Sequence, residues 1–135
     1  MAFGYRTSIV KTKPCVVLST VLKLKKGDRS EISATMQELS AKRREKQPLE
    51  YPSAGSTFKR PEGYFAGKLI MDAGLAGASV GGAQVSEKHC GFVINRKNAT
   101  SADVAGLIQK VTETVQEKFG VTLEPEVIFL GDFEK

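Results

Sequence analysis

The sequence predicts an α+β domain, a single unit in which helices pack on a mixed or antiparallel sheet. Its 135 residues are 41% hydrophobic and 26% charged, which suits one globular core. Segments with a helical period and segments rich in β-branched residues are intermixed without strict alternation, which favours α+β over a doubly wound parallel sheet. No apolar run approaches the roughly 20 residues that a membrane span needs. We expect the element order β-α-α-β-β-α-β.

The first two elements are predicted over residues 15–26 and 28–47. Residues 15–26 are rich in β-branched side chains and end at a Gly-Asp turn signal, so they are typical of a strand. Asp28, with Glu31 three residues later, is typical of a helix start, and Pro48 ends that helix. Three apolar residues at helical spacing form one face of this helix: Ile32, Met36 and Leu39.

The middle of the chain combines a long loop with short elements. Residues 47–63 carry three prolines and two glycines, and a loop of this length is often functional. A short helix is expected over 65–73, closed by Gly74. Residues 78–86 and 91–95 are expected to be strands joined by a turn.

The strongest helix signal follows in residues 101–119. Thr100 or Ser101 can cap its start, an apolar stripe runs along it, and Gly120 stands where a C-cap is expected. Residues 121–129 are expected to be the last strand. Pro125 interrupts it, which predicts an edge position or a bulge.

Charge is distributed unevenly along the chain. Residues 1–60 carry a net charge of +8 and residues 61–135 carry −3, for a total of +5. A basic half favours an anionic partner such as nucleic acid, a nucleotide or a phosphorylated substrate. Two solvated faces would give the same pattern.

Ser56 is the first candidate for chemistry. It follows Ala54-Gly55, small residues that clear space for a ligand, and it precedes Lys59 and Arg60, which could hold an anion. A turn serine that bonds its own backbone is the alternative explanation. Because the chain has one histidine, a Ser-His-Asp hydrolase is disfavoured.

Two further residues could contribute to a site. Glu126 shares a strand face with Glu124 and could act as an acid, a base or a hydrogen-bond partner, although water is the usual neighbour of a glutamate. Arg6 could clamp a carboxylate or phosphate, or it could be simply solvated.

Other chemistries find little support. His89 lies in a predicted turn and has no partners for a metal site, so we expect no metal. Cys15 and Cys90 lack metal spacing and are expected to be buried, reduced residues. The glycines form neither a G-x-G-x-x-G fingerprint nor a Walker A loop. With no secretory signal in the first residues, a cytoplasmic location is expected.

Four ordered segments carry a resemblance to a known family. They are GYRTS near the start, YPSAGSTFKRPEGYFAGKLI, GGAQVSEKHCGFVIN and GVTLEPEVIFLG. Together they resemble UDP-N-acetylenolpyruvoylglucosamine reductase, the flavoenzyme of peptidoglycan precursor synthesis that is also called UDP-N-acetylmuramate dehydrogenase. The compact loops are similar to the family's second type. The resemblance covers only the C-terminal part of the family.

The resemblance implies roles for particular residues. Ser56 matches the serine that protonates the substrate carbon after hydride transfer. Arg6 matches the arginine, and Glu126 the glutamate, that stabilise the enol-like intermediate at the substrate carboxylate. Substrate-binding roles are implied for five more residues: Tyr5, Lys46, Lys59, Arg60 and His89. Arg60 stands where some members have asparagine, and His89 falls near a position where others use glutamine.

The resemblance also implies cofactors, partners and domains. FAD and NADPH would serve the full-length enzyme, whereas none is expected on these residues alone. Residues 1–14 would be the tail of a missing FAD-binding region, and residues 15–135 the C-terminal UDP-sugar substrate-binding domain. The expected partners are the UDP-sugar and the FAD domain, with no nucleic acid and no membrane. The alternative is a stand-alone basic module that binds RNA or another polyanion.

Overall fold

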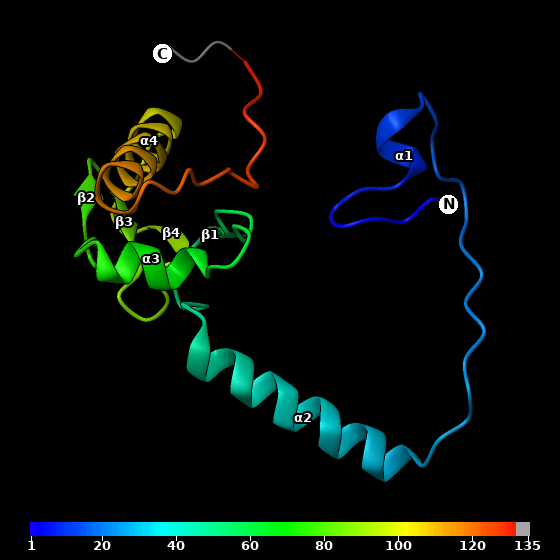
Figure 1. The fold of residues 1–135 in the computed structure, drawn as a ribbon. Helices are drawn as coiled ribbons and strands as arrows, with labels where there is room; N and C mark the ends of the chain where they lie inside the picture. Colours follow the sequence, from blue (N-terminus) through cyan, green and yellow to red (C-terminus); the bar gives the residue numbers. More distant parts are fainter. Residues whose placement is uncertain (132–135) are drawn as a thin grey trace. The chain divides into compact units, whose positions relative to one another are not determined.

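The computed structural model describes residues 1–131 and contains four helices and four strands in that range (Figure 1). The chain divides into two compact units, Met1–Thr35 and Met36–Lys135. The elements follow in the order α1 (Ile9–Thr12), α2 (Arg29–Lys46), β1 (Ser53–Ser56), α3 (Ala66–Asp72), β2 (Ser79–Val80), β3 (Ala83–Val85), β4 (Phe92–Asn95) and α4 (Ser101–Phe119).

The first unit contains little regular structure. Residues 15–26 form no strand, so that prediction is wrong, and their apolar side chains are exposed: Leu18 is 93% and Val21 95% accessible. Cys15 is also exposed, contrary to expectation. A strand needs a partner for its backbone groups, and no described segment pairs with this one.

Helix α2 begins and ends as predicted. The Asp28 carboxylate accepts hydrogen bonds from the backbone N–H groups of Ser30 (2.9 Å) and Glu31 (3.0 Å), and α2 ends two residues before Pro48. None of its residues is buried, and Ile32, Met36 and Leu39 are 50%, 67% and 60% accessible.

The second unit is built on a four-stranded antiparallel sheet in the order β1-β4-β3-β2. The strand predicted over 78–86 is two strands, β2 and β3, joined at Gly81-Gly82. Gly82 is required there because a Cβ atom would lie 2.1 Å from the Lys97 carbonyl oxygen. Strand β1 lies inside residues 47–63, which were predicted to be a loop, so this strand was not predicted.

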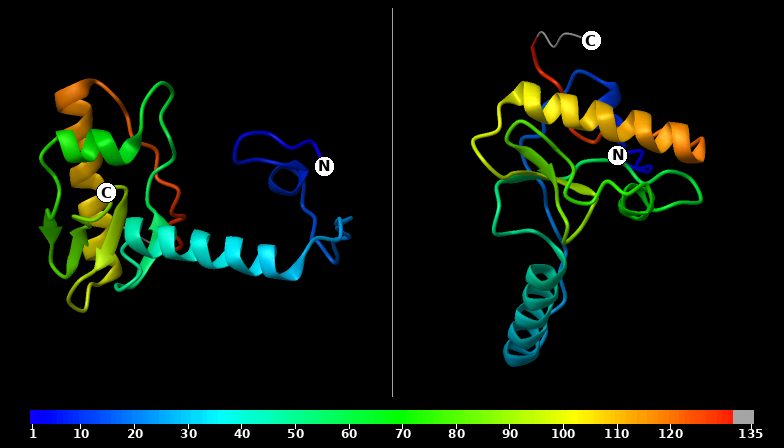
Figure 2. Two further views of the ribbon diagram at one scale, coloured as in Figure 1. Left: turned by 90° about the horizontal axis from the view of Figure 1, so that it is seen from below. Right: turned by 90° about the vertical axis from the view of Figure 1, so that its left-hand side faces the viewer.

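The two faces of the sheet differ in what they contact. On one face, Val85 of β3 and Val93 of β4 pair directly and belong to the hydrophobic core. Helix α4 packs over β2, β3 and β4 on the core side, and α3 packs against α4 (Figure 2). Because alternate residues of a strand point to opposite faces, Phe92 and Ile94 lie on the other face.

Helix α4 confirms its prediction in detail. The Thr100 side chain accepts from the Asp103 N–H, the Asp103 carboxylate accepts from the Thr100 N–H, and Gly120 at φ +67° closes the helix. Four residues of its apolar stripe are buried: Leu107, Ile108, Val111 and Val115. Helix α3 also falls where expected, followed by Gly74 at φ +78°.

Residues 121–131 form no regular strand, contrary to expectation. Instead, Pro125 makes an isolated antiparallel bridge with Phe58. The Lys59 N–H donates to the Glu124 carbonyl and the Glu126 N–H to the Thr57 carbonyl, each at 2.8 Å. Pro125 has no backbone N–H to donate, but the pairing does not need one. The Glu124 carbonyl accepts one of the two bonds and the Glu126 N–H donates the other.

The fold is therefore α+β with an antiparallel sheet, as predicted. The element order differs from the expected one: the strands expected at both ends are absent from the described residues, helix α1 and strand β1 were not expected, and one expected strand is two. No helix in residues 1–131 combines the length and the apolar character needed to cross a membrane.

Candidate functional site

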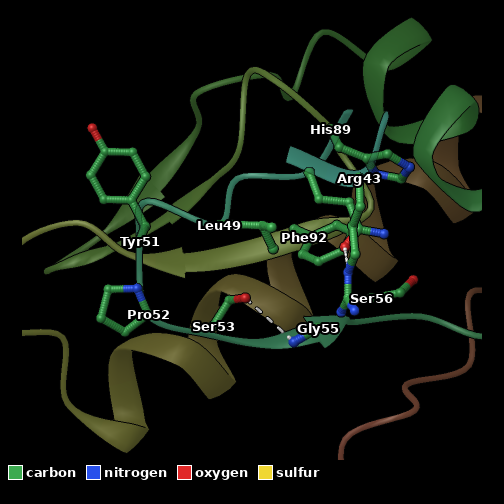
Figure 3. A pocket seen from close by; sticks show the side chains of 10 residues that line it. Arg43, Leu49, Tyr51, Pro52, Ser53, Gly55, Ser56, His89 and Phe92 are labelled. Carbon is green, nitrogen blue, oxygen red and sulfur yellow. Dashed lines mark hydrogen bonds between the residues drawn. The ribbon is translucent and has the colours of Figure 1, made fainter. Parts of the chain in front are cut away.

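A pocket of about 550 Å³ lies against the sheet face that carries Phe92 (Figure 3). The register pairs Ser56 with Phe92 and Ser53 with Ile94, and paired residues point to the same face, so both serines belong to this face. The last turn of α2, the segment after it, β1 and the turn before β4 supply the walls. The lining residues are Arg43, Gln47, Leu49, Tyr51, Pro52, Ser53, Gly55, Ser56, His89 and Phe92.

A β-bulge in β1 brings the two serines to one face. Three residue steps from Ser53 to Ser56 oppose only two steps from Ile94 to Phe92, so β1 contains one extra residue. Without it, residues three apart would point to opposite faces. Gly55 adopts φ +89°, a conformation that favours glycine, and a Cβ there would meet no atom within 4 Å. The Ala-Gly pair therefore both bends the strand and leaves the pocket open.

The Ser56 side chain makes a local backbone hydrogen bond, as the turn-serine explanation expects, and it is also accessible. Its hydroxyl donates to the Phe58 carbonyl oxygen at 3.4 Å, a long bond within the local turn. The same residue lines the pocket and is exposed. A weakly held, accessible hydroxyl can reorient toward a ligand.

The structure brings Glu126 next to the Ser56 segment. The Glu126 N–H donates to the carbonyl oxygen of Thr57, the residue after Ser56, although 70 positions separate Ser56 from Glu126 in the sequence. The Glu126 Oε2 atom is buried. This contact is made by the backbone, and the Glu126 side chain is not among the ten that line the pocket.

Thr57, which the sequence did not single out as a candidate, holds these segments together. Its N–H donates to the Gly91 carbonyl (2.8 Å), its carbonyl accepts from Glu126 (2.8 Å), and its Oγ1 accepts from the Val93 N–H (3.0 Å). Only 3% of Thr57 is exposed. A buried threonine beside a candidate serine carries no distinguishing sequence signal.

Two of the predicted anion-binding cations interact with protein groups. Lys59 forms an ion pair with Glu124. The Arg60 guanidinium lies 4.0 Å from the centroid of the Phe65 ring, and its Nε donates to the Tyr64 carbonyl at 3.3 Å. Neither residue lines the pocket around Ser56.

His89 and Lys46 are placed differently. His89 lines the pocket and is exposed, as the turn prediction expects. Its Nδ1 accepts from the Gly91 N–H at 3.2 Å. Its ring stands edge-on to Phe92, with centroids 5.1 Å apart. Lys46 is exposed at the end of α2 and does not line the pocket.

Tyr5 and Arg6 belong to the first unit. They occupy a tight turn in which Gly4 and Thr7 exchange backbone hydrogen bonds, at 3.0 and 3.3 Å. Arg6 adopts φ +56°, an uncommon conformation for a residue other than glycine. Both side chains are exposed.

The described residues offer little to a metal ion or a dinucleotide. Within residues 1–131, no three His, Cys, Asp or Glu side chains are grouped to hold a metal. The Gly81-Gly82 pair is filled by protein: Cβ atoms would lie 2.2 Å from the Asp103 carboxylate and 2.1 Å from a backbone oxygen. Burial raises the pKa of the Cys90 thiol, which disfavours the nucleophilic thiolate.

By its fold and pocket, this chain is an α+β domain with an open pocket on one face of its sheet. Its open pocket combines an arginine, a histidine and two serines over an aromatic floor, and none of the ten lining residues is acidic. Such a lining suits an anionic small molecule.

Comparison with known proteins identifies the family. The model of the C-terminal domain of UDP-N-acetylenolpyruvoylglucosamine reductase matches residues 47–130. The chain therefore belongs to this family by its C-terminal domain, as the sequence resemblance predicts.

Individual relatives agree with the family assignment. The UDP-N-acetylenolpyruvoylglucosamine reductase of Agathobacter rectalis is 66% identical over 130 residues, covering 96% of this chain and 41% of its own length. The reductase of the same name from Lachnoclostridium phytofermentans is 60% identical over 132 residues, covering 98% and 43%. The chain thus spans about two fifths of the length of these curated relatives.

A solved structure agrees as well. The crystal structure of UDP-N-acetylenolpyruvylglucosamine reductase from Thermus caldophilus superimposes with a TM-score of 0.61 at 38% identity. The match covers 77% of this chain and 37% of that chain. The α+β fold is therefore shared with a known member of the family.

Proposed function

We propose that this chain is the UDP-sugar-binding part of a flavin-dependent reductase that converts UDP-N-acetylglucosamine enolpyruvate to UDP-N-acetylmuramate. One observation carries the proposal: the β1 bulge presents Ser56 at an open pocket without acidic residues, and the backbone of Glu126 pairs with the next residue, Thr57. Family membership and the reductase names of the relatives support it.

In this proposal Ser56 donates a proton to the substrate carbon after hydride transfer. A serine hydroxyl is a weak acid, so it is useful only when it faces a strongly basic carbanion at short range. Arg6 and Glu126 stabilise the charge that builds at the neighbouring carboxylate. Arg6 lies in the other unit, so its part rests on the sequence motif.

The nucleotide part of the substrate would be held by polar and cationic side chains. Of the five residues expected to bind substrate, His89 lines the pocket, where its imidazole can hydrogen-bond a ligand. Lys59 can serve only after exchanging its ion pair with Glu124. Lys46, Arg60 and Tyr5 would have to act from outside the pocket around Ser56.

FAD, reduced by NADPH, is the hydride source that the family implies. The described residues do not fit it, because the one glycine pair that could cradle a phosphate is filled by Asp103 and a backbone oxygen. We therefore assign FAD to the three fifths of the relatives outside the match. Residues 1–14 would be the tail of that region and residues 15–135 the substrate domain, acting in the cytoplasm.

The exposed apolar residues of the first unit support such a partner. Val16, Leu18, Leu22 and Leu24 are each at least 74% accessible and alternate along the chain. An apolar, strand-like segment without partners is suited to pair with further polypeptide. We propose that its partner is an FAD-binding domain of the kind that the family implies.

A chimera tests the function. The chain would replace the matching region of the Agathobacter rectalis reductase, and NADPH oxidation would be followed with and without the enolpyruvyl UDP-sugar. We expect substrate-dependent turnover, which Ser56→Ala abolishes while NADPH still reduces the flavin. Ser53→Ala, on the same strand and pocket face, is the matched control and should keep most activity. Equal turnover of the Ser56→Ala and wild-type chimeras would exclude the proposed proton donor.

The alternative of a basic module that binds RNA gains no support from the comparisons, whose names are those of reductases. Steeply salt-dependent binding of single-stranded RNA would be its signature.

A further inference from the structure

Arg43 is the one arginine or lysine that lines the pocket around Ser56. It lies in the last turn of α2 and is exposed, and its side chain extends toward the part of β1 that carries Gly55 and Ser56 (Figure 3). Arg43 and Ser56 belong to the same compact unit. The sequence does not single out Arg43, because this residue stands in a run of charged residues at a helix end.

The Arg43 side chain is held in position by its own helix turn. Its Nε donates to the Gln47 side-chain oxygen at 3.0 Å, four residues further along the chain. A guanidinium has five N–H donors, and this bond uses one of them. The two terminal nitrogens lie in one plane and can donate two hydrogen bonds to a carboxylate or a phosphate.

Among residues 1–131, no carboxylate belongs to the pocket wall that Arg43 lines. None of the ten lining residues is acidic, and Lys59, the cation expected from sequence to bind phosphate, is paired with Glu124 instead. The α2 C-terminus carries the negative end of the helix dipole, so it repels an anion. An anion bound here must therefore be held by side-chain charge, and Arg43 supplies it.

We propose that Arg43 binds the diphosphate of the UDP-sugar. The inference rests on the proposed function, which supplies the nucleotide. The diphosphate offers several anionic oxygens to a fork of donors, and His89 adds a polar group along the same wall. Lys46, three residues after Arg43 and thus a neighbour on the helix surface, brings a second positive charge.

The test is direct binding to this chain, measured by isothermal titration and by ³¹P NMR with UDP, uridine and inorganic pyrophosphate as probes. Arg43→Met removes the guanidinium. Arg44→Met is the matched control, because it removes the same charge from the adjacent helix position outside the pocket. Both variants should melt with the wild type, since neither residue is buried.

We expect Arg43→Met to weaken UDP and pyrophosphate binding at least tenfold and uridine binding less than twofold. Arg44→Met should change UDP affinity less than twofold, because an exposed, screened charge contributes little. UDP or pyrophosphate binding unaffected by Arg43→Met would overturn the inference while leaving the proposed function intact. An equal loss of uridine binding would overturn it too, since the effect would not belong to the phosphates. If wild-type chain binds none of the three probes, both the inference and the substrate-binding role of this chain fail.

Discussion

Replacing Thr57 by valine should loosen the strand that presents Ser56. Thr57 is 3% exposed, and its Oγ1 accepts the Val93 N–H at 3.0 Å. Valine has nearly the same shape but no oxygen, so the Val93 N–H would remain buried without an acceptor. The penalty for such an orphaned donor is about 1–3 kcal/mol, and we expect the free energy of unfolding to fall by that amount.

Urea unfolding gives the stability change, and amide hydrogen exchange locates it. In Thr57→Val, the Val93 amide should exchange faster than in the wild type by more than the global loss of stability explains. Thr57→Ser keeps the oxygen and loses a methyl group. It should also destabilise the fold, but the Val93 amide should stay selectively protected.

Thr112→Val is the matched control. The Thr112 hydroxyl donates to the Ile108 carbonyl within α4 at 2.9 Å, so its removal orphans no backbone donor and should cost less. The reasoning is refuted if Thr57→Val leaves Val93 protection unchanged, or if Thr112→Val is as destabilising as Thr57→Val.

Two further predictions concern the joint between the β2–β3 hairpin and α4. Hydrogen bonds from the N–H groups of Thr100 and Gly82 hold the pKa of the Asp103 carboxyl below its usual value. Because the folded pKa is the lower one, the stability from Asp103 is present above the unfolded pKa of about 3.9 and is lost as pH falls through the folded pKa. Urea midpoints measured from pH 6 to 2.5 should therefore fall less steeply in Asp103→Asn; parallel curves would contradict this. Gly82→Ala should destabilise by about 1–3 kcal/mol or more, since its Cβ would lie 2.1 Å from a backbone oxygen. Gly106→Ala, whose Cβ would lie 3.6 Å from the nearest side-chain atom, should not destabilise, and equal effects would refute the packing argument.

Local signals predicted the helices well because helices satisfy their own backbone. In α4, the cap at Thr100, the apolar stripe and Gly120 are all encoded within the element, and each appears as expected. The strands fared worse. Residues 15–26 carry the right pattern but have no partner within the described chain, whereas β1 was hidden in a segment rich in proline and glycine. A strand depends on residues distant in sequence, which a local pattern cannot supply.

In the candidate site, too, the sequence indicated some residues and not others. Ser56 and His89 were predicted from the sequence and do meet in one pocket. Lys59 was expected at the ligand, but the bridge that places Phe58 opposite Pro125 also brings Lys59 to Glu124. Arg43 was overlooked because the sequence does not reveal that the last turn of α2 borders β1. Residue type indicated candidate residues, and tertiary pairing decided which cation lines the pocket.

The bulge in β1 explains how one short strand can serve both packing and chemistry. A regular strand would place Ser53 and Ser56 on opposite faces, so one of them would point toward the core. The extra residue at Gly55 turns both outward, and the next residue, Thr57, returns to the interior at 3% exposure. Thr57 can then bond β4 and the Glu126 segment while Ser56 stays accessible. The accessibility of Ser56 and the burial of Thr57 are thus two consequences of a single backbone irregularity. A loss of the bulge should therefore disturb the pocket and the strand pairing together.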